Sequence, residues 1–296
     1  MLDLLDRMPG LHDPLTLRLL LPLALSFALA GLFRLVFGPR GRVIASAAIP
    51  LSALTVHLIL AGLPGLPPTT GDKIAWLTMA GIAIGLVLDL VRVPRSLSWL
   101  ALILWPAVVI AWICVETVLA VPHLPETGPD GAFRSLVLIA LLLGFWVAAS
   151  TALSRLDSAG GFNAAIMLAV AAAGLGFVLL HSSLPRLGVP ALALASATGG
   201  FLLWNLGRTR FPFESAAILG GGTFLLGLGA SFAHSADNAV ALVILALLAL
   251  VFFADRSARR VPLGAGRAGR LTAPLVLVGI AAVPALAAIA VAILLL

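Results

Sequence analysis

Charged residues are scarce in this chain: Asp, Glu, Lys and Arg make up 10% of its 296 residues, against about a quarter in typical soluble domains. Tyrosine is absent, the hydrophobic residues amount to 61%, and the mean hydropathy is +1.17. A chain of this composition cannot cover its surface with polar groups in water. A water-soluble globular fold is therefore excluded.

Cysteine and lysine are almost absent as well. Cys114 is the only cysteine, which excludes an intramolecular disulfide and a cysteine-rich metal site. Lys73 is the only lysine, so the rest of the 18 basic residues are arginines. They lie mostly in short loops between apolar runs, where they indicate membrane topology. Nucleic acid is therefore not an expected partner.

The apolar residues occur in blocks of about 17 to 25, the length that a helix needs to cross a bilayer. Runs such as 239–254 and 275–296 are apolar on every side, which excludes the alternating pattern of a membrane β-barrel. The sequence predicts an all-α, polytopic integral membrane helix bundle of about ten transmembrane helices, a single membrane domain over residues 1–296 with no soluble domain. The expected spans lie near 15–37, 43–63, 74–91, 97–121, 133–153, 162–181, 188–206, 215–234, 238–254 and 272–296.

The basic residues predict the orientation of these spans, because Lys and Arg collect in short cytoplasmic loops. Alternate loops divide them 13 to 5. The larger set is Arg34, Arg40, Arg42, Arg92, Arg95, Arg155, Arg208, Arg210, Arg256, Arg259, Arg260, Arg267 and Arg270, and the smaller is Arg7, Arg18, Lys73, Arg134 and Arg186. With an even number of spans, both termini are expected on the non-cytoplasmic side of a bacterial cytoplasmic (inner) membrane. The acidic start of the chain argues against a cleavable signal, so the first span is expected to remain.

Glycines within the spans predict close helix packing, because small residues let helix backbones approach where lipid gives no hydrophobic drive. Gly81 and Gly85 lie four residues apart in one span, and Gly220, Gly221, Gly222, Gly227 and Gly229 lie in another. A flexible or pathway-lining helix is the alternative for the second group. The only internal similarity pairs Asp89-Leu-Val-Arg-Val-Pro-Arg with Asp255-Arg-Ser-Ala-Arg-Arg-Val-Pro, six spans apart, which does not support a five-plus-five repeat.

All five histidines are expected in the outer half of the bundle, joined there by acidic residues. Ionisable groups in a span are costly and therefore candidates for function. This outer polar cluster is the predicted substrate-binding site; its members are His57, Glu116, His123, His181, His234 and Asp237. The alternatives are interfacial histidines at helix ends with His57 hydrogen-bonded to a nearby carbonyl, or a metal or bis-histidine haem site at His57 and His181.

No central carboxylate or lysine of the kind that proton-coupled carriers use is expected at the membrane midplane, and no catalytic motif is present. The first functional hypothesis is a carrier or channel-like permease for a small neutral or lipophilic solute, without a cofactor. In length and expected span number the chain is similar to the drug and metabolite transporter superfamily, whose termini usually lie inside. No motif residue carries over from that similarity.

Two hypotheses of other classes remain. One is a non-catalytic accessory subunit that packs against other membrane subunits or against a second copy of the chain, with membrane lipid as the remaining partner. The other is an outer-leaflet intramembrane enzyme that acts on a lipid-linked substrate. Such an enzyme would use His57, Glu116, His123 and Asp237 as acids, bases or metal ligands.

Overall fold

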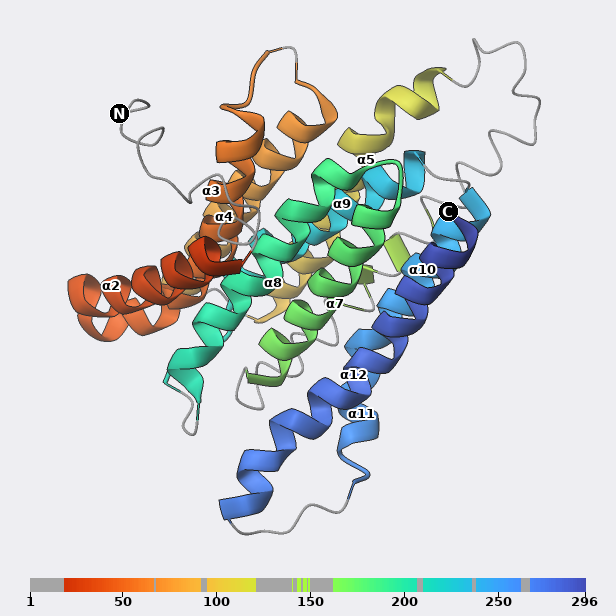
Figure 1. The fold of residues 1–296 in the computed structure, drawn as a ribbon. Helices are drawn as coiled ribbons and strands as arrows, with labels where there is room; N and C mark the ends of the chain where they lie inside the picture. The colour runs from red at the N-terminus through yellow and green to blue at the C-terminus, as the bar shows by residue number, and fades with distance from the viewer. Residues whose placement is uncertain are drawn as a thin grey trace, which may run out of the picture.

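The computed structural model of the chain is all-helical (Figure 1). It describes residues 19–66, 68–91, 95–120, 140, 143, 144, 146, 147, 149, 162–206, 210–235, 238–261 and 267–296, without the side chains of 95–97, 114–120, 234–235, 238–239 and 267–271. No strand occurs within these residues. The helices are α2 (Leu21–Ile44), η2 (Ala45–Ala47), α3 (Ala48–Ala61), α4 (Thr70–Val91), α5 (Arg95–Ala120), α7 (Phe162–His181), α8 (Pro185–Asn205), η4 (Ala217–Gly221), α9 (Gly222–Ser235), α10 (Asn238–Leu250), η5 (Val251–Phe253), α11 (Ala254–Ala258) and α12 (Arg267–Leu295).

Six segments of the described residues are long and apolar enough to cross a membrane. They are Leu21–Ala61, Thr70–Val91, Phe162–His181, Pro185–Asn205, Val240–Ala258 and Thr272–Leu295. Two shorter apolar helices, Ser98–Ile113 and Ala217–Ala233, accompany them. The helical fold predicted from the sequence is thus confirmed, with six candidate membrane-spanning segments among the described residues, and the expected number of about ten stays a prediction.

The first of the six segments, 41 residues long, reverses direction within α2. Gly38 has φ 57° and ψ −130°, a backbone conformation that glycine adopts more readily than other residues, and Pro39 follows it. A Cβ built on Gly41 would lie 1.9 Å from the carbonyl oxygen of Phe33, although residues eight apart in a straight helix are separated by about 12 Å along its axis. The segment therefore consists of two arms that lie side by side (Figure 1).

The helix formed by η4 and α9 is the centre of the described bundle, since every residue from 216 to 233 is buried. Two glycines of α4, Gly81 and Gly85, allow that helix to pack closely against the central helix. A Cβ on Gly81 would lie 2.8 Å from the carbonyl oxygen of Leu219, and one on Gly85 would lie 2.4 Å from the Cα of Ala216. The predicted packing role of these two glycines is confirmed. Residues 217–221 form a π-helical turn, which is rare and occurs mostly as a single turn inside a longer helix.

Trp146 connects this central helix to α5. Its ring occupies the space that a side chain on Gly222 would fill, because a Cβ there would lie 2.0 Å from Trp146 Cη2. Its indole N–H donates a hydrogen bond of 3.2 Å to the carbonyl oxygen of Leu102. That oxygen would normally accept from residue 106, but Pro106 has no N–H. Trp146 therefore donates to the carbonyl oxygen of Leu102 the hydrogen bond that Pro106 cannot supply.

The helices α7 and α8 form an antiparallel pair joined at Ser182, and α12 runs along the other side of α7 (Figure 1). Small residues again permit the contact: a Cβ on Gly176 would lie 2.7 Å from Leu192 Cγ. The end of the pair at His181 and Pro185 is called the histidine end below. The opposite end, at Phe162 and Asn205, is called the arginine end because Arg42, Arg210 and Arg259 lie there.

Candidate functional site

His57 of α3 is buried, with 3% of its surface exposed. Its Nε2–H donates a hydrogen bond of 3.2 Å to the carbonyl oxygen of Gly71, in the first turn of α4. The ring also packs edge-on against Phe224 of α9, with centroids 5.7 Å apart. His57 therefore connects α3 to α4, as the alternative of a carbonyl-bonded histidine predicted.

His181 is the last residue of α7 and is exposed. Its Nδ1 lies 2.8 Å from the carbonyl oxygen of Phe177, one turn earlier, and donates the hydrogen bond because a carbonyl can only accept. In the neutral ring, Nε2 then carries a lone pair and can accept a hydrogen bond from outside the helix.

The rest of the predicted outer cluster is not placed. His123 and Asp237 lie outside the described residues, and the side chains of Glu116 and His234 are not described. The two histidines that are placed have separate carbonyl partners on different helices. Within the described residues, no group of three His, Cys, Asp or Glu could hold a metal ion. A substrate-binding role for the six residues stays a prediction.

At the arginine end, Asp89 stabilises the start of the central helix. Its carboxylate oxygens accept hydrogen bonds from the backbone N–H groups of Ser215 and Ala216, each 3.0 Å long. A helix leaves its first N–H groups without internal partners, and a carboxylate there also interacts favourably with the helix dipole. A hollow of about 520 Å³ beside this contact is lined by Arg40, Val43, Asp89 and Leu90.

The chain between α8 and η4 is held by a second polar group, Asn205. Its Oδ1 accepts from the N–H groups of Arg210 and Phe211 at 2.8 and 2.9 Å, and its Nδ2 donates to the carbonyl oxygen of Phe211 at 3.1 Å. Arg42 donates from Nε to the carbonyl oxygen of Arg210 at 3.0 Å. These bonds connect α2 and α8 to the segment that precedes the central helix.

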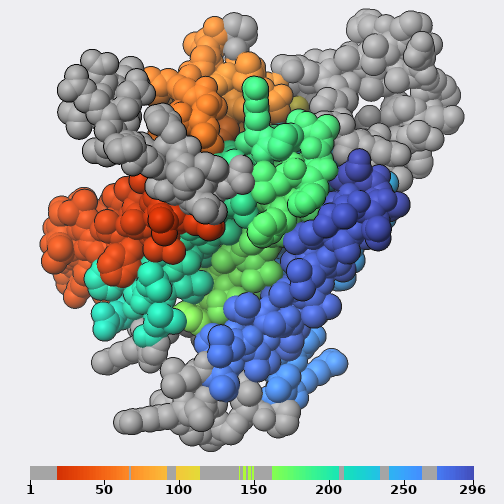
Figure 2. Space-filling model, viewed as in Figure 1, coloured from red at the N-terminus to blue at the C-terminus, as the bar shows by residue number. Residues whose placement is uncertain are grey.

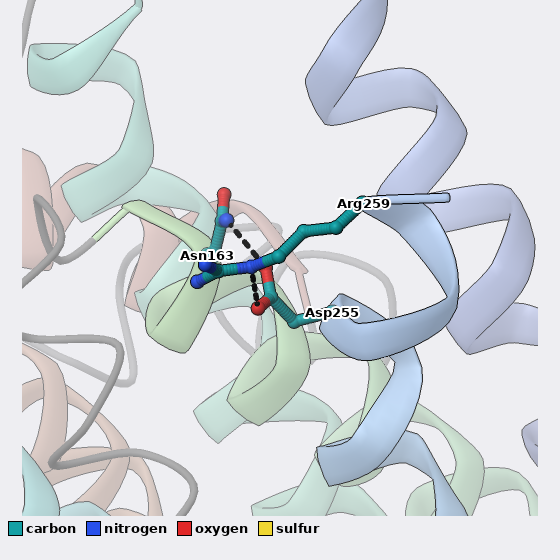
Figure 3. Close-up of polar contacts among 3 residues, drawn as sticks. All are labelled: Asn163, Asp255 and Arg259. Atoms are coloured by element: carbon teal, nitrogen blue, oxygen red, sulfur yellow. Dashed lines mark hydrogen bonds and ion pairs between the residues drawn. The ribbon is translucent and has the colours of Figure 1, made fainter. Parts of the chain in front are cut away.

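Asp255 makes a third contact of this kind (Figure 3). It accepts a hydrogen bond of 2.8 Å from Asn163 Nδ2, in the first turn of α7, and one of 2.7 Å from Arg259 Nε. Asp255 is buried, whereas the Arg259 side chain is 63% exposed. Asp89 and Asp255, which begin the two similar sequence stretches, thus each connect the end of one helix to the beginning of another.

An apolar recess with a volume of about 520 Å³ lies along α7, between α8 and α12. It is lined by Leu19, Ile166, Ala169, Val170, Ala173, Phe177, Leu180, Leu192, Ala195, Ser196, Leu202 and Val278. We call it the α7 groove. Among the described residues that line it, Ser196 is the one with a polar side chain, and the Ser196 hydroxyl already donates to the carbonyl oxygen of Leu19. Figure 2 shows this face, with α7 between α8 and α12.

The α7 groove was not predicted from the sequence. Its lining residues in α7 repeat at steps of three and four, but so do the buried residues on the opposite side of the same helix. The arginine-end contacts were missed for a different reason: Asp89 was noted only as the start of one of the two similar stretches, and Asn205 lies at the end of the span expected near 188–206. Their partners are backbone groups, which carry no signature in the sequence.

The chain matches no protein-family model, and it matches no curated protein. Its class follows from the six apolar helices, which are those of an integral membrane protein.

Proposed function

We propose that this chain is a carrier or channel-like permease for a small neutral or lipophilic solute, and that the solute binds in the α7 groove. The observation that supports this is the groove itself, whose volume of about 520 Å³ lies in the range of ligand pockets, about 300 to 1,000 Å³. The described residues that line it are apolar except for Ser196.

The lining favours a solute without charge. No Asp, Glu, Lys or Arg is among the described residues that line the groove. A charged group placed there would lose its hydration without gaining a partner, which costs several kcal/mol in an apolar environment. An apolar solute loses nothing of this kind and gains contact with the walls.

The test uses purified protein reconstituted in liposomes with a panel of neutral, fluorescently labelled lipophiles: an alkyl alcohol, a diacylglycerol and a sterol. Quenching from outside by dithionite measures how fast each probe crosses between leaflets. We expect faster crossing of at least one probe with the wild type than with Ala173→Trp, which fills the groove. Val283→Trp, on an exposed face of α12, serves as the matched control. Equal rates for all proteins and protein-free liposomes would refute the proposal.

The proposal includes ten membrane crossings, of which the described residues show six segments of sufficient length. Three observations support the larger number. The reversal at Gly38 divides the first segment into two arms. The helix α5 is 26 residues long, and residues 217–235 continue through η4 and α9. Helical residues between 140 and 149 support the expected span near 133–153.

The orientation remains part of the same proposal: the arginine end faces the cytoplasm of a bacterial cell, and both termini lie outside. Labelling of single cysteines with a membrane-impermeant maleimide tests it, and Cys114→Ser provides the cysteine-free background. In intact spheroplasts Ser183→Cys should react, whereas Ser257→Cys should react only after the membrane is opened. Both serines are exposed, at the histidine end and the arginine end respectively. The reverse pattern would overturn the orientation.

A further inference from the structure

We infer that Lys73 of α4 and Glu116 of α5 are a charge pair inside the bundle, near its histidine end, and that the pair holds the end of α5 against α4. This inference goes beyond the proposed function. It gives Glu116 a role other than the substrate binding expected from the sequence. It follows from the burial of Lys73, from the side of α4 on which Lys73 lies, and from the register of α5.

Lys73, the only lysine of the chain, is buried within a segment long enough to cross a membrane. It is 2% exposed and lies in the first turn of α4, inside Thr70–Val91. Charged side chains in membrane spans are rare, face the interior of the bundle and pair with one another. The positive end of the helix dipole also lies in this turn and disfavours a cation there. A negatively charged partner is therefore expected at Lys73.

The contacts of α4 indicate which helix lies beside Lys73. Ala75 belongs to an apolar cluster with Leu54 of α3, and Gly81 meets the central helix. At about 100° per residue, Lys73 lies about 160° around the helix from Ala75 and about 80° from Gly81. Leu77, one turn after Lys73, belongs to the cluster that contains the buried apolar residues of α5. Because α5 contacts both α4 and the central helix, Lys73 lies on the side of α4 where α5 packs.

The register of α5 places Glu116 on the side that packs against the central helix. Trp105, eleven residues earlier, donates a hydrogen bond of 2.8 Å from Nε1 to Thr223 Oγ1 of the central helix. Eleven residues make about three turns, so positions 105 and 116 lie on nearly the same side of α5. Glu116 is also the only acidic residue in the sequence of α5.

A contact at Gly227 shows that Lys73 and Glu116 lie at similar levels of the bundle. A Cβ on Gly227 would lie 3.0 Å from Ile74 Cγ1 and 3.5 Å from Ile113 Cδ1. Lys73 is one residue beyond this level and Glu116 three residues beyond it, both toward the histidine end, because α4 and α5 are antiparallel. At about 1.5 Å per residue, the two positions differ by about 3 Å along the helix axes.

The dipoles of both helices favour the same pairing. Glu116 lies just before the last turn of α5, at its negative end, whereas Lys73 lies at the positive end of α4. Each residue thus has the charge that its own helix end disfavours and the neighbouring helix end favours. The pair stabilises the contact of α5 with α4 beyond Pro106, where α5 lacks one helical hydrogen bond.

Cross-linking tests whether the two positions lie close together. Lys73→Cys and Glu116→Cys are combined in the Cys114→Ser background, and the full chain in lipid nanodiscs is treated with a short bis-methanethiosulfonate. Mass spectrometry of peptides measures the cross-linked fraction, which we expect to exceed one half. Ala75→Cys with Glu116→Cys is the matched control and should cross-link at least tenfold less, because Ala75 lies on the α3 side. Equal cross-linking of both pairs, or none of the first, would overturn the inference.

Charge exchange tests the pairing itself through the yield of folded, monodisperse protein in dodecyl maltoside. Lys73→Glu and Glu116→Lys should each lower this yield at least fivefold, and their combination should restore at least half of it. Lys73→Met should also lower the yield, because it leaves one buried charge unpaired, whereas Lys73→Met with Glu116→Gln should be close to the wild type. Rescue of Lys73→Met by Asp72→Asn instead of Glu116→Gln would assign the partner to Asp72 and refute the inference.

These two tests measure proximity and folding, so their outcomes do not depend on whether a solute crosses the membrane. The liposome assay then separates the two roles of Glu116. Folded Lys73→Met, Glu116→Gln protein should move the neutral probes as the wild type does. Loss of that movement would mean that Glu116 acts on the solute, contrary to the role inferred here.

Discussion

Replacing Trp146 by phenylalanine tests how the structure satisfies the carbonyl that Pro106 leaves without a donor. The phenyl ring keeps most of the apolar contact at Gly222 but cannot donate to the carbonyl oxygen of Leu102, which lies 3.2 Å from the indole nitrogen. Leu102 is buried, so the oxygen has no access to bulk water. We expect the free energy of unfolding to fall by about 1 to 2 kcal/mol.

A double-mutant cycle separates the hydrogen bond from the loss of ring contact. In Pro106→Ala the backbone N–H of residue 106 can donate to Leu102 O in the ordinary helical way. The phenylalanine substitution should then cost less in this background, with a coupling energy of about 1 kcal/mol. Hydrogen bonds between membrane helices average about 0.6 kcal/mol and reach about 1.7 kcal/mol, so this value lies within the measured range.

Equilibrium unfolding in mixed micelles of dodecyl maltoside and sodium dodecyl sulfate provides the four free energies. Trp112→Phe, on the exposed side of α5, is the matched control and should change the free energy of unfolding by less than about 0.5 kcal/mol. If Trp146→Phe costs the same with proline and with alanine at residue 106, the indole does not compensate for the proline, and the reasoning is wrong.

Three further predictions concern the stability of the bundle and are checked by the same unfolding measurement. Gly85→Ala should lower it by about 1 to 3 kcal/mol because the new Cβ meets the backbone of the central helix, whereas Gly279→Ala, with nothing within 4 Å, should leave it unchanged or raise it. Asp89→Ala should cost about 1 to 2 kcal/mol through loss of the helix cap, and Asp89→Asn, which retains one acceptor oxygen, about half as much. Asp255→Ala should cost more than Arg259→Ala, for which we expect less than about 1 kcal/mol because the arginine is 63% exposed; a larger effect of the arginine would contradict this account.

Much of the fold could be predicted from the sequence because apolar length and turn residues determine where a membrane helix can begin and end. The span expected near 162–181 is α7, Phe162–His181, and the loop expected at Gly38 is the reversal within α2. The glycine pair in α4 was predicted to pack closely and does so. These are local properties, which a single stretch of sequence contains.

The features that depend on distant partners could not be predicted in this way. Trp146 lies within the span expected near 133–153, but nothing in that stretch predicts that it is 3% exposed and bonds to a residue 44 positions away. His57 was recognised as an unusual residue within a span, yet its partner, Gly71, is a backbone carbonyl. The α7 groove is a shape, and the same apolar residue types line both it and the core.

The π-helical turn at Ala217–Gly221 determines where this chain can lose a residue. A π turn contains about one residue more than an α turn, so deleting one residue there can restore regular α-helical bonding while every later residue of α9 keeps its direction. A deletion within α7 would instead turn the following residues by about 100° around the helix axis. Phe177 and His181 would then leave the groove side, so the central helix can be shortened where α7 cannot.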